Sequence, residues 1–140
     1  MPYSPVKRVV VWGSEKSPSV VLLGAWLGWK LQAEVSLATI GAAERGLYRV
    51  AIEREDGQTV MFRPGKSIAI LETPHAPQQQ IALPVRTLAE CISEELRRLD
   101  PDDTYGEVLK SAFPTIEMHP TRCESEPLLD EREYPEVFDA

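Results

Sequence analysis

Hydrophobic and polar residues follow one another along the first third of the chain in a pattern that predicts a strand, a helix and a second strand. Residues 6–12, VKRVVVW, form a nearly continuous β-branched run, typical of a strand buried on both faces near the centre of a sheet. Ser17 and Pro18 suit the start of a helix, which extends to about Gln32 and has apolar residues on more than one face. We therefore expect an enclosed helix, followed by a weakly alternating strand over 34–40.

Two glycines, Gly24 and Gly28, lie four residues apart inside this predicted helix. Each costs up to about 1 kcal/mol relative to alanine in a helix interior. Close packing of the helix on the sheet is the first interpretation of that cost. The alternative is a ligand or a partner that approaches the helix backbone.

The middle of the chain alternates with a period of two residues and predicts an antiparallel meander. Polar and apolar residues alternate over 47–53, and Asp56 with Gly57 is typical of a type I′ hairpin turn. The polar stretch 73–80, TPHAPQQQ, predicts a loop, and Pro84 places the last strand at an edge of the sheet. The other strands predicted here are 59–62, 68–71 and 81–85.

Residues 87–112 predict two helices that meet at a tight corner and dock on the rest of the domain. Thr87 and Glu90 have the spacing of a capping box at the start of the first helix. Asp100 suits the N-cap of the second helix, with Pro101 in its first turn. Apolar side chains line one face of each helix: Leu88, Ile92, Leu96 and Leu99 in the first, and Tyr105, Val108, Leu109 and Ala112 in the second.

These elements together predict an α+β fold: one βα unit, an antiparallel β-meander and a C-terminal helix-corner-helix. We expect a single domain over residues 1–116. Residues 117–140 are acidic, contain three prolines and show no sustained period, so we expect a flexible tail there. This segment holds eight of the 22 acidic residues and two of the 15 basic ones, so most of the net charge of −7 belongs to the tail.

From charge and hydropathy we expect neither a nucleic-acid partner nor a membrane partner. Lys and Arg form no cluster of the kind that neutralises phosphates, which argues against a nucleic-acid partner. The longest apolar run, 20–29, is about half the roughly twenty residues needed to cross a bilayer. The first residues also lack the apolar core and cleavage site of a signal peptide. We therefore expect a cytoplasmic protein without a membrane partner.

Residue patterns typical of catalysis or metal binding are missing from the sequence. It contains no G-x-S-x-G elbow and no phosphate-binding glycine loop, and His75 and His119 have no further ligands at metal-binding spacing. Cys91 and Cys123 are far apart in sequence; we expect Cys91 to be a small buried apolar residue, with a redox switch as the alternative. The sequence therefore predicts a protein that is not an enzyme, needs no cofactor and acts by contact; a small enzyme of unrecognised type is a further alternative, which the missing residue patterns disfavour.

Three arginines provide the other candidate for function. Arg49, Arg63 and Arg86 lie on or beside predicted strands, so they could present a weakly basic sheet face to an acidic or phosphorylated ligand. A small-ligand sensing domain for a sugar phosphate or a nucleotide is therefore an alternative function. Ordinary solvated arginines explain the same pattern.

Four stretches in order along the chain resemble one known family. They resemble motifs in the carboxy-terminal domain of the OpcA family, the glucose-6-phosphate dehydrogenase assembly proteins. In chain order, the stretches are SPSVVLLGAWLGWKL, EREDGQTVMFRP, ALPVRTLAECISEEL and EELRRLDPDDTY. The resemblance extends from about Ser17 to Leu109. Full members of that family have an additional amino-terminal domain, so the chain corresponds either to a fragment or to a short relative.

The resemblance implies a non-catalytic accessory protein that binds glucose-6-phosphate dehydrogenase and promotes its assembly or activation in the oxidative pentose phosphate pathway. Such a protein works by binding one state of the enzyme better than another and so favouring it. The candidate contact residues for this partner or for a ligand are Arg49, Arg63, Arg86, Arg97, Asp102 and Tyr105.

Overall fold

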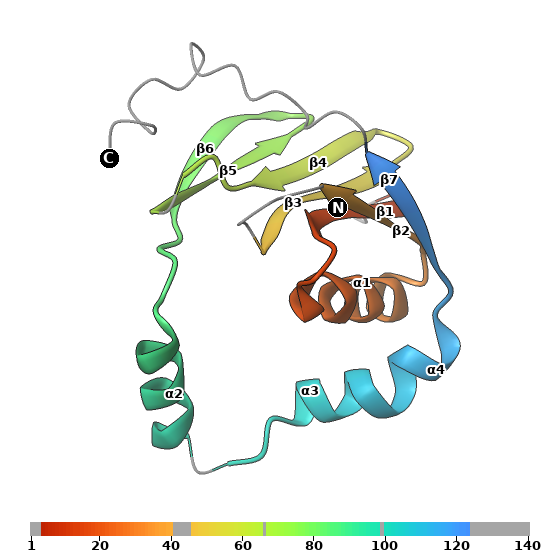
Figure 1. The fold of residues 1–140 in the computed structure, drawn as a ribbon. Coiled ribbons are helices and arrows are strands. Elements are labelled where there is room, and N and C mark those ends of the chain that lie inside the picture. Colours follow the sequence, from red (N-terminus) through yellow and green to blue (C-terminus); the bar gives the residue numbers. More distant parts are fainter. Residues whose placement is uncertain (1–3, 41–45, 66, 99, 124–140) are drawn as a thin grey trace.

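The computed structural model describes residues 4–40, 46–65, 67–98 and 100–123, which form a mixed sheet with its packed helices on one side (Figure 1). The seven strands follow the order β6-β5-β4-β3-β1-β2-β7. Helix α1 lies against the sheet, and the helical segment α3–α4 lies below α1 as a further layer. The strands are β1 (Val6–Ser14), β2 (Glu34–Ile40), β3 (Leu47–Arg54), β4 (Gly57–Phe62), β5 (Ile68–Thr73), β6 (Ala76–Ala82) and β7 (Met118–Cys123).

The predicted βα unit is confirmed at the centre of this sheet. Strands β1 and β2 are parallel and are joined by α1 (Pro18–Leu31), which begins after Ser17 and ends at Gln32 with a left-handed backbone. Val9, Val10 and Val11 of β1 are all buried, so the strand is enclosed on both faces as its β-branched run predicts. We call the face of the sheet that carries α1 the helix side and the other face the far side.

Close packing of α1 on the sheet explains its two internal glycines. A Cβ atom on Gly24 would lie 2.8 Å from Cδ2 of Leu37, and one on Gly28 would lie 2.5 Å from Cγ2 of Val35. Val35 is fully buried and has little room to move. The packing interpretation is therefore confirmed, and glycine lets the helix approach β2 more closely than any other residue would.

The antiparallel meander β3-β4-β5-β6 is also confirmed, with two differences in detail. The β3–β4 hairpin turns at Glu55 and Asp56, and Gly57, with φ of +139°, already pairs with Arg54. A type I′ turn needs positive φ at both turn residues, which neither of these two has, so that turn type was wrong.

The second difference concerns the stretch 73–80, which was predicted as a loop. Most of it belongs to β6, which pairs antiparallel with β5 as far as Ala82. The strand therefore precedes the predicted position, 81–85, although it does form an edge of the sheet as Pro84 indicates. Because neither face of this strand is buried, its sequence, APQQQIA, need not alternate between apolar and polar residues, and that alternation is the pattern by which a strand is recognised.

The third layer consists of one helical segment that runs from Asp103 to Thr115. Its parts are α3 (Asp103–Glu107), a π-helical turn η1 (Val108–Ala112) and α4 (Phe113–Thr115). Val108 and Ala112 are buried against Ala25 of α1, with Trp26 and Trp29 at the margin of the same cluster. Helix α1 is thus enclosed between the sheet and this segment, as its apolar residues on several faces predict.

The beginning of the predicted tail instead forms the second edge of the sheet. Strand β7 pairs in parallel with β2 over its whole length, from Val35 opposite Met118 to Ile40 opposite Cys123. The apolar Met118 packs in the cluster between α1 and the third layer, and this contact favours the strand. Residues 124–140, the rest of the predicted tail, lie outside the described residues.

Candidate contact surface

Helix α2 (Leu88–Arg97) stands apart from the layered body, below the β6 edge of the sheet (Figure 1). The predicted capping box holds its first turn together. The Thr87 amide donates to Oε2 of Glu90 at 2.7 Å, and the Glu90 amide donates to Oγ1 of Thr87 at 3.3 Å. The start of the helix is therefore fixed by local hydrogen bonds, before any contact with the body is made.

The same hydrogen bonds act on the titration of the Glu90 side chain. Donation from the Thr87 backbone and hydroxyl stabilises the carboxylate and lowers the pKa of Glu90 below its ordinary value of 4.5, and the nearby charge of Arg86 acts in the same direction. The carboxylate is thus part of the helix cap at neutral pH.

The apolar stripe of α2 is exposed, which contradicts the expectation that these helices dock. Leu88 is 76% exposed, Ile92 50% and Leu96 75%, and no residue of the helix is buried. Leu99, the fourth residue of the predicted stripe, lies outside the described residues. The stripe itself is therefore present, but the body of the protein does not cover it.

The described residues of the connection between the two helices, 98 and 100–102, also differ from the predicted tight corner. The C-cap residue Arg98 is extended, and α3 begins after Asp102, whose carboxylate accepts from the Tyr105 amide at 2.9 Å. Asp102, two residues beyond the predicted Asp100, is therefore the N-cap.

A second apolar area, partly exposed, lies on the helix side of the sheet at β4 and β6, with the buried Ala69 of β5 between them. The pairing of Val50 with Met61 and of Met61 with Leu71 puts these side chains on the same side as α1. Helix α1 packs on β1 and β2, and Met61 and Ile81 each remain 37% exposed. We call the helix side of β4–β6 the open half-face; its exposed large apolar residues are Met61, Ile81 and Leu83.

A third set of exposed apolar side chains lies on the third layer, the helical segment from Asp103 to Thr115, which we also call the outer helical segment. Tyr105, Leu109 and Phe113 follow one another at intervals of four residues and are exposed, beside the buried Val108 and Ala112. We call these three residues the outer row. Exposed apolar residues that recur in this way are typical of surfaces that meet another protein.

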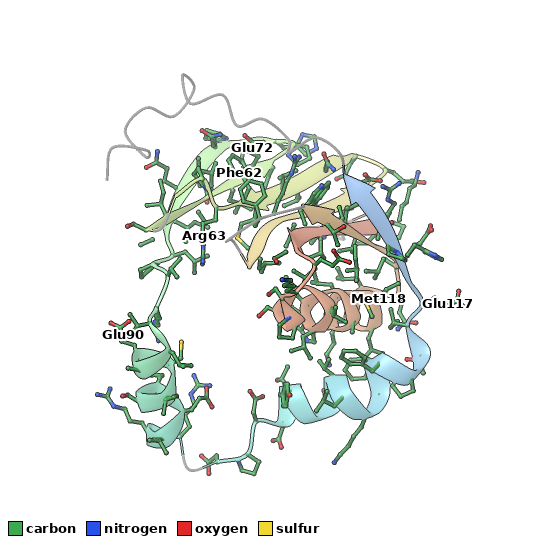
Figure 2. All side chains as sticks on the ribbon, in the orientation of Figure 1. Phe62, Arg63, Glu72, Glu90, Glu117 and Met118 are labelled. Atoms are coloured by element: carbon green, nitrogen blue, oxygen red, sulfur yellow. The ribbon has the colours of Figure 1, made fainter. Side chains whose placement is uncertain are left out.

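The structure does not bring the three candidate arginines together. Arg49 is opposite Phe62 on the far side of the sheet, where its guanidinium lies 4.8 Å from the centre of the Trp12 ring. Arg63 is next to Phe62 and therefore points to the helix side, as Figure 2 shows. Arg86 lies in the exposed connection to α2. The predicted basic sheet face is therefore not formed.

The other candidate residues lie on or beside the helices. Arg97 belongs to α2, and its guanidinium is 3.9 Å from the Glu94 carboxylate with most of the side chain in solvent. Asp102 caps α3, and Tyr105 is the first residue of the outer row. Cys91 is exposed on α2, so the expectation that it is buried was wrong.

The residues that the structure describes bear on two further functions, metal binding and membrane crossing. His119 has Nε2 3.8 Å from a Glu34 carboxylate oxygen at the β2–β7 edge. Over residues 4–40, 46–65, 67–98 and 100–123 no three His, Cys, Asp or Glu side chains come together as metal ligands. None of the helices within these ranges is long and apolar enough to cross a membrane.

Sequence reasoning missed the open half-face and the exposure of α2. The alternation in 47–71 shows which side chains share a face, but it does not show that α1 covers only part of that face. The stripe of α2 was recognised correctly, and only the position of the helix in space reveals that the stripe is uncovered.

The chain was compared with known families, curated proteins and solved structures. Residues 1–109 match the family OpcA_G6PD_C, described as the C-terminal domain of a glucose-6-phosphate dehydrogenase subunit. No curated protein and no solved structure matches the chain. The family match covers the βα unit, the meander, α2 and the start of the outer helical segment. The chain therefore belongs to the OpcA_G6PD_C family of C-terminal domains.

Proposed function

We propose that this protein is a non-catalytic accessory protein that binds glucose-6-phosphate dehydrogenase and promotes its assembly or activation. The observation that supports this proposal is the match of residues 1–109 to a family named after a subunit of that enzyme. The exposed apolar surfaces agree with a function of contact. Binding that favours one oligomeric or conformational state of the enzyme is sufficient to raise its activity.

The outer row is the surface that we assign to the enzyme. Tyr105 and Leu109 offer apolar area at the centre, and aromatic residues are frequent among the side chains that dominate binding energy. Asp102, Asp103 and Glu107 belong to the same segment and leave it slightly negative, because three carboxylates outnumber the cations Lys110 and Lys30, whose ammonium is 3.4 Å from Glu107. A complementary enzyme surface is apolar with a basic rim.

The test is a binding and activity measurement with the glucose-6-phosphate dehydrogenase of the same organism. We expect the full chain to co-purify with the enzyme and to raise its rate at limiting substrate. Leu109→Glu places a carboxylate in the outer row and should weaken binding at least about tenfold, since an apolar centre tolerates an unpaired charge poorly.

A matched control variant is Gln80→Glu, which adds a carboxylate at an exposed position of β6, opposite Ile70 on the far side of the sheet. If Gln80→Glu binds the enzyme as strongly as the unaltered chain does, then the weaker binding of Leu109→Glu results from the position of the carboxylate in the outer row and not from added negative charge alone. Absence of both binding and activation with the unaltered chain would overturn the proposed function. Binding that Leu109→Glu leaves unchanged would overturn only the assigned surface.

A further inference from the structure

The sheet has room for a second helix on its helix side. Sheets in two-layer folds bury their apolar face under helices, and here α1 packs mainly on β1 and β2, with Val50 of β3 in the same apolar cluster (Figure 1). The three strands β4, β5 and β6 have a width of about 10 Å, because neighbouring strands lie about 4.8 Å apart, and a helix is about 10 Å wide. The open half-face therefore fits one helix beside α1.

The face has the chemistry of a helix-binding surface. Of its described residues, those that point to the helix side within the three strands are uncharged; Met61 lies opposite Leu71, and Ile81 lies opposite Ala69, diagonal to Leu71. Figure 2 places the Arg63 side chain at the end of β4, on the same side of the sheet. An amphipathic helix with acidic residues beside its apolar stripe is the complementary occupant.

Helix α2 has these properties and is itself without a packing surface. Its stripe of Leu88, Ile92 and Leu96 spans just over two turns. Glu95 supplies an acidic residue beside it, while Glu94 pairs with Arg97 on the polar side. A helix of ten residues is too short to persist in water by itself, because isolated helices below about 12–15 residues are marginal. Burial of the stripe is therefore needed for α2 to remain helical.

The connections of α2 direct it away from the open half-face of its own chain. The Leu83 amide still donates to the Ser67 carbonyl at 2.9 Å, so the chain follows the sheet to this point. Pro84 stiffens the next step, and the capping box begins at Thr87, which leaves only two residues for a reversal. Short, stiff connections of this kind favour exchange of an element between copies.

We propose that two copies of this chain exchange α2, so that each apolar stripe covers the open half-face of the other copy. The exchange is reciprocal and follows a two-fold axis, the commonest symmetry of protein dimers. It buries Leu88, Ile92 and Leu96 against Met61, Ile81 and Leu83, and it brings Glu95 toward Arg63 of the second copy. This interaction does not depend on the dehydrogenase.

Sedimentation velocity of the full chain at increasing concentration tests the exchange. We expect twice the chain mass of 15.7 kDa at high micromolar concentration and dissociation on dilution. Ile92→Glu on the stripe and Ile81→Glu on the open half-face should each give the mass of a single chain, while Arg97→Glu, on the polar side of α2, should leave the dimer intact. Circular dichroism checks that each variant is folded. A single-chain mass for the unaltered protein at all concentrations would overturn the proposal.

Mixing and cross-linking identify the occupant of the open half-face. In an equimolar mixture, the Ile81→Glu copy keeps an intact stripe and the Ile92→Glu copy keeps an intact open half-face. One of the two exchange contacts can therefore form, and the dimer should reappear. In a Cys123→Ser background and with an added mild oxidant that takes up the two electrons and two protons of the thiols, Met61→Cys should form a disulfide with the exposed Cys91 of a second copy and run as a dimer without reductant. A bond within one chain would show that α2 closes on its own sheet. A dimer that neither Ile92→Glu nor Ile81→Glu dissociates would place the interface elsewhere, and either result would overturn the exchange.

Discussion

Individual residues show how tightly the body of this protein is packed, and Gly28 gives the most direct test. The Cβ of Gly28→Ala would lie 2.5 Å from Val35 and 3.0 Å from Ile116, so either the helix or the sheet must move. Overpacking of this kind costs about 1–3 kcal/mol, against a gain of up to about 1 kcal/mol in helix propensity. We expect Gly28→Ala to lower the free energy of unfolding by about 1–2 kcal/mol in urea titrations.

Gly106 in α3 provides the control for this prediction. No atom lies within 4 Å of a Cβ built on Gly106, so Gly106→Ala gains helix propensity without a clash. It should raise the free energy of unfolding by up to about 1 kcal/mol. Equal effects of the two substitutions would show that helix propensity, not the contact with β2, determines the role of Gly28.

Glu90 provides a prediction about pH. Its pKa in the folded chain is lowered by the hydrogen bonds from Thr87, so the cap stabilises the folded state at pH values above 4.5 and is lost as pH falls through the lowered value. In NMR titrations the Thr87 amide signal should therefore shift with a midpoint below 4.5. In Glu90→Gln the amide keeps a hydrogen-bond acceptor that does not titrate, and the shift should disappear. A midpoint above 4.5 would contradict the capping geometry.

At the scale of elements, the parts that the sequence predicts well are those that local interactions determine. The capping box at Thr87, the continuous β-branched run before Ser14 and the β3–β4 hairpin each depend on residues a few positions apart, and all three form. The βα unit follows from the same local patterns, because a strand, a helix and a second strand in quick succession favour parallel pairing around the helix.

The elements that were missed depend on contacts between distant parts of the chain. Strand β6 exposes all its side chains and is held by backbone pairing with β5 and by the Gln78 side-chain amide, which donates to Oε1 of Glu72 at 2.8 Å. Strand β7 contains a proline and no alternation, and it forms because β2 offers it an edge. The burial of α2 was wrongly expected because an apolar stripe shows which face of a helix can pack, and the chain path determines whether it does.

Strand β7 also provides a prediction at this scale. A chain that ends at Cys123 keeps β7, and one that ends at Glu117 lacks both the β2–β7 pairing and the Met118 contacts with α1 and the third layer. Loss of a packed methionine side chain costs about 2 kcal/mol or more. We expect the shorter chain to be less stable than the longer one by at least about this amount in urea titrations. Equal stability would show that β7 does not contribute to the fold.

At the scale of the whole molecule, the described residues divide into an enclosed half and an open half. The enclosed half stacks the sheet, α1 and the outer helical segment around Val9, Val11 and Ala25. The open half leaves Met61, Ile81 and Leu83 partly exposed on the helix side, while Ala69 there is buried, and α2 lies below the β6 edge (Figure 1). This division explains how a chain of this size can be firmly folded and still offer a large apolar surface to other chains.

The pairing of β2 with β7 has a consequence for the way the chain is made. These neighbours are more than 80 positions apart in sequence, so β2 leaves the ribosome well before its outer neighbour exists. Until Met118–Cys123 has been synthesised, the backbone groups along that edge of β2 remain without their native partner. Long-range pairing of this kind forms late. Before the β2–β7 pair has formed, chaperone binding and aggregation compete with completion of the native sheet.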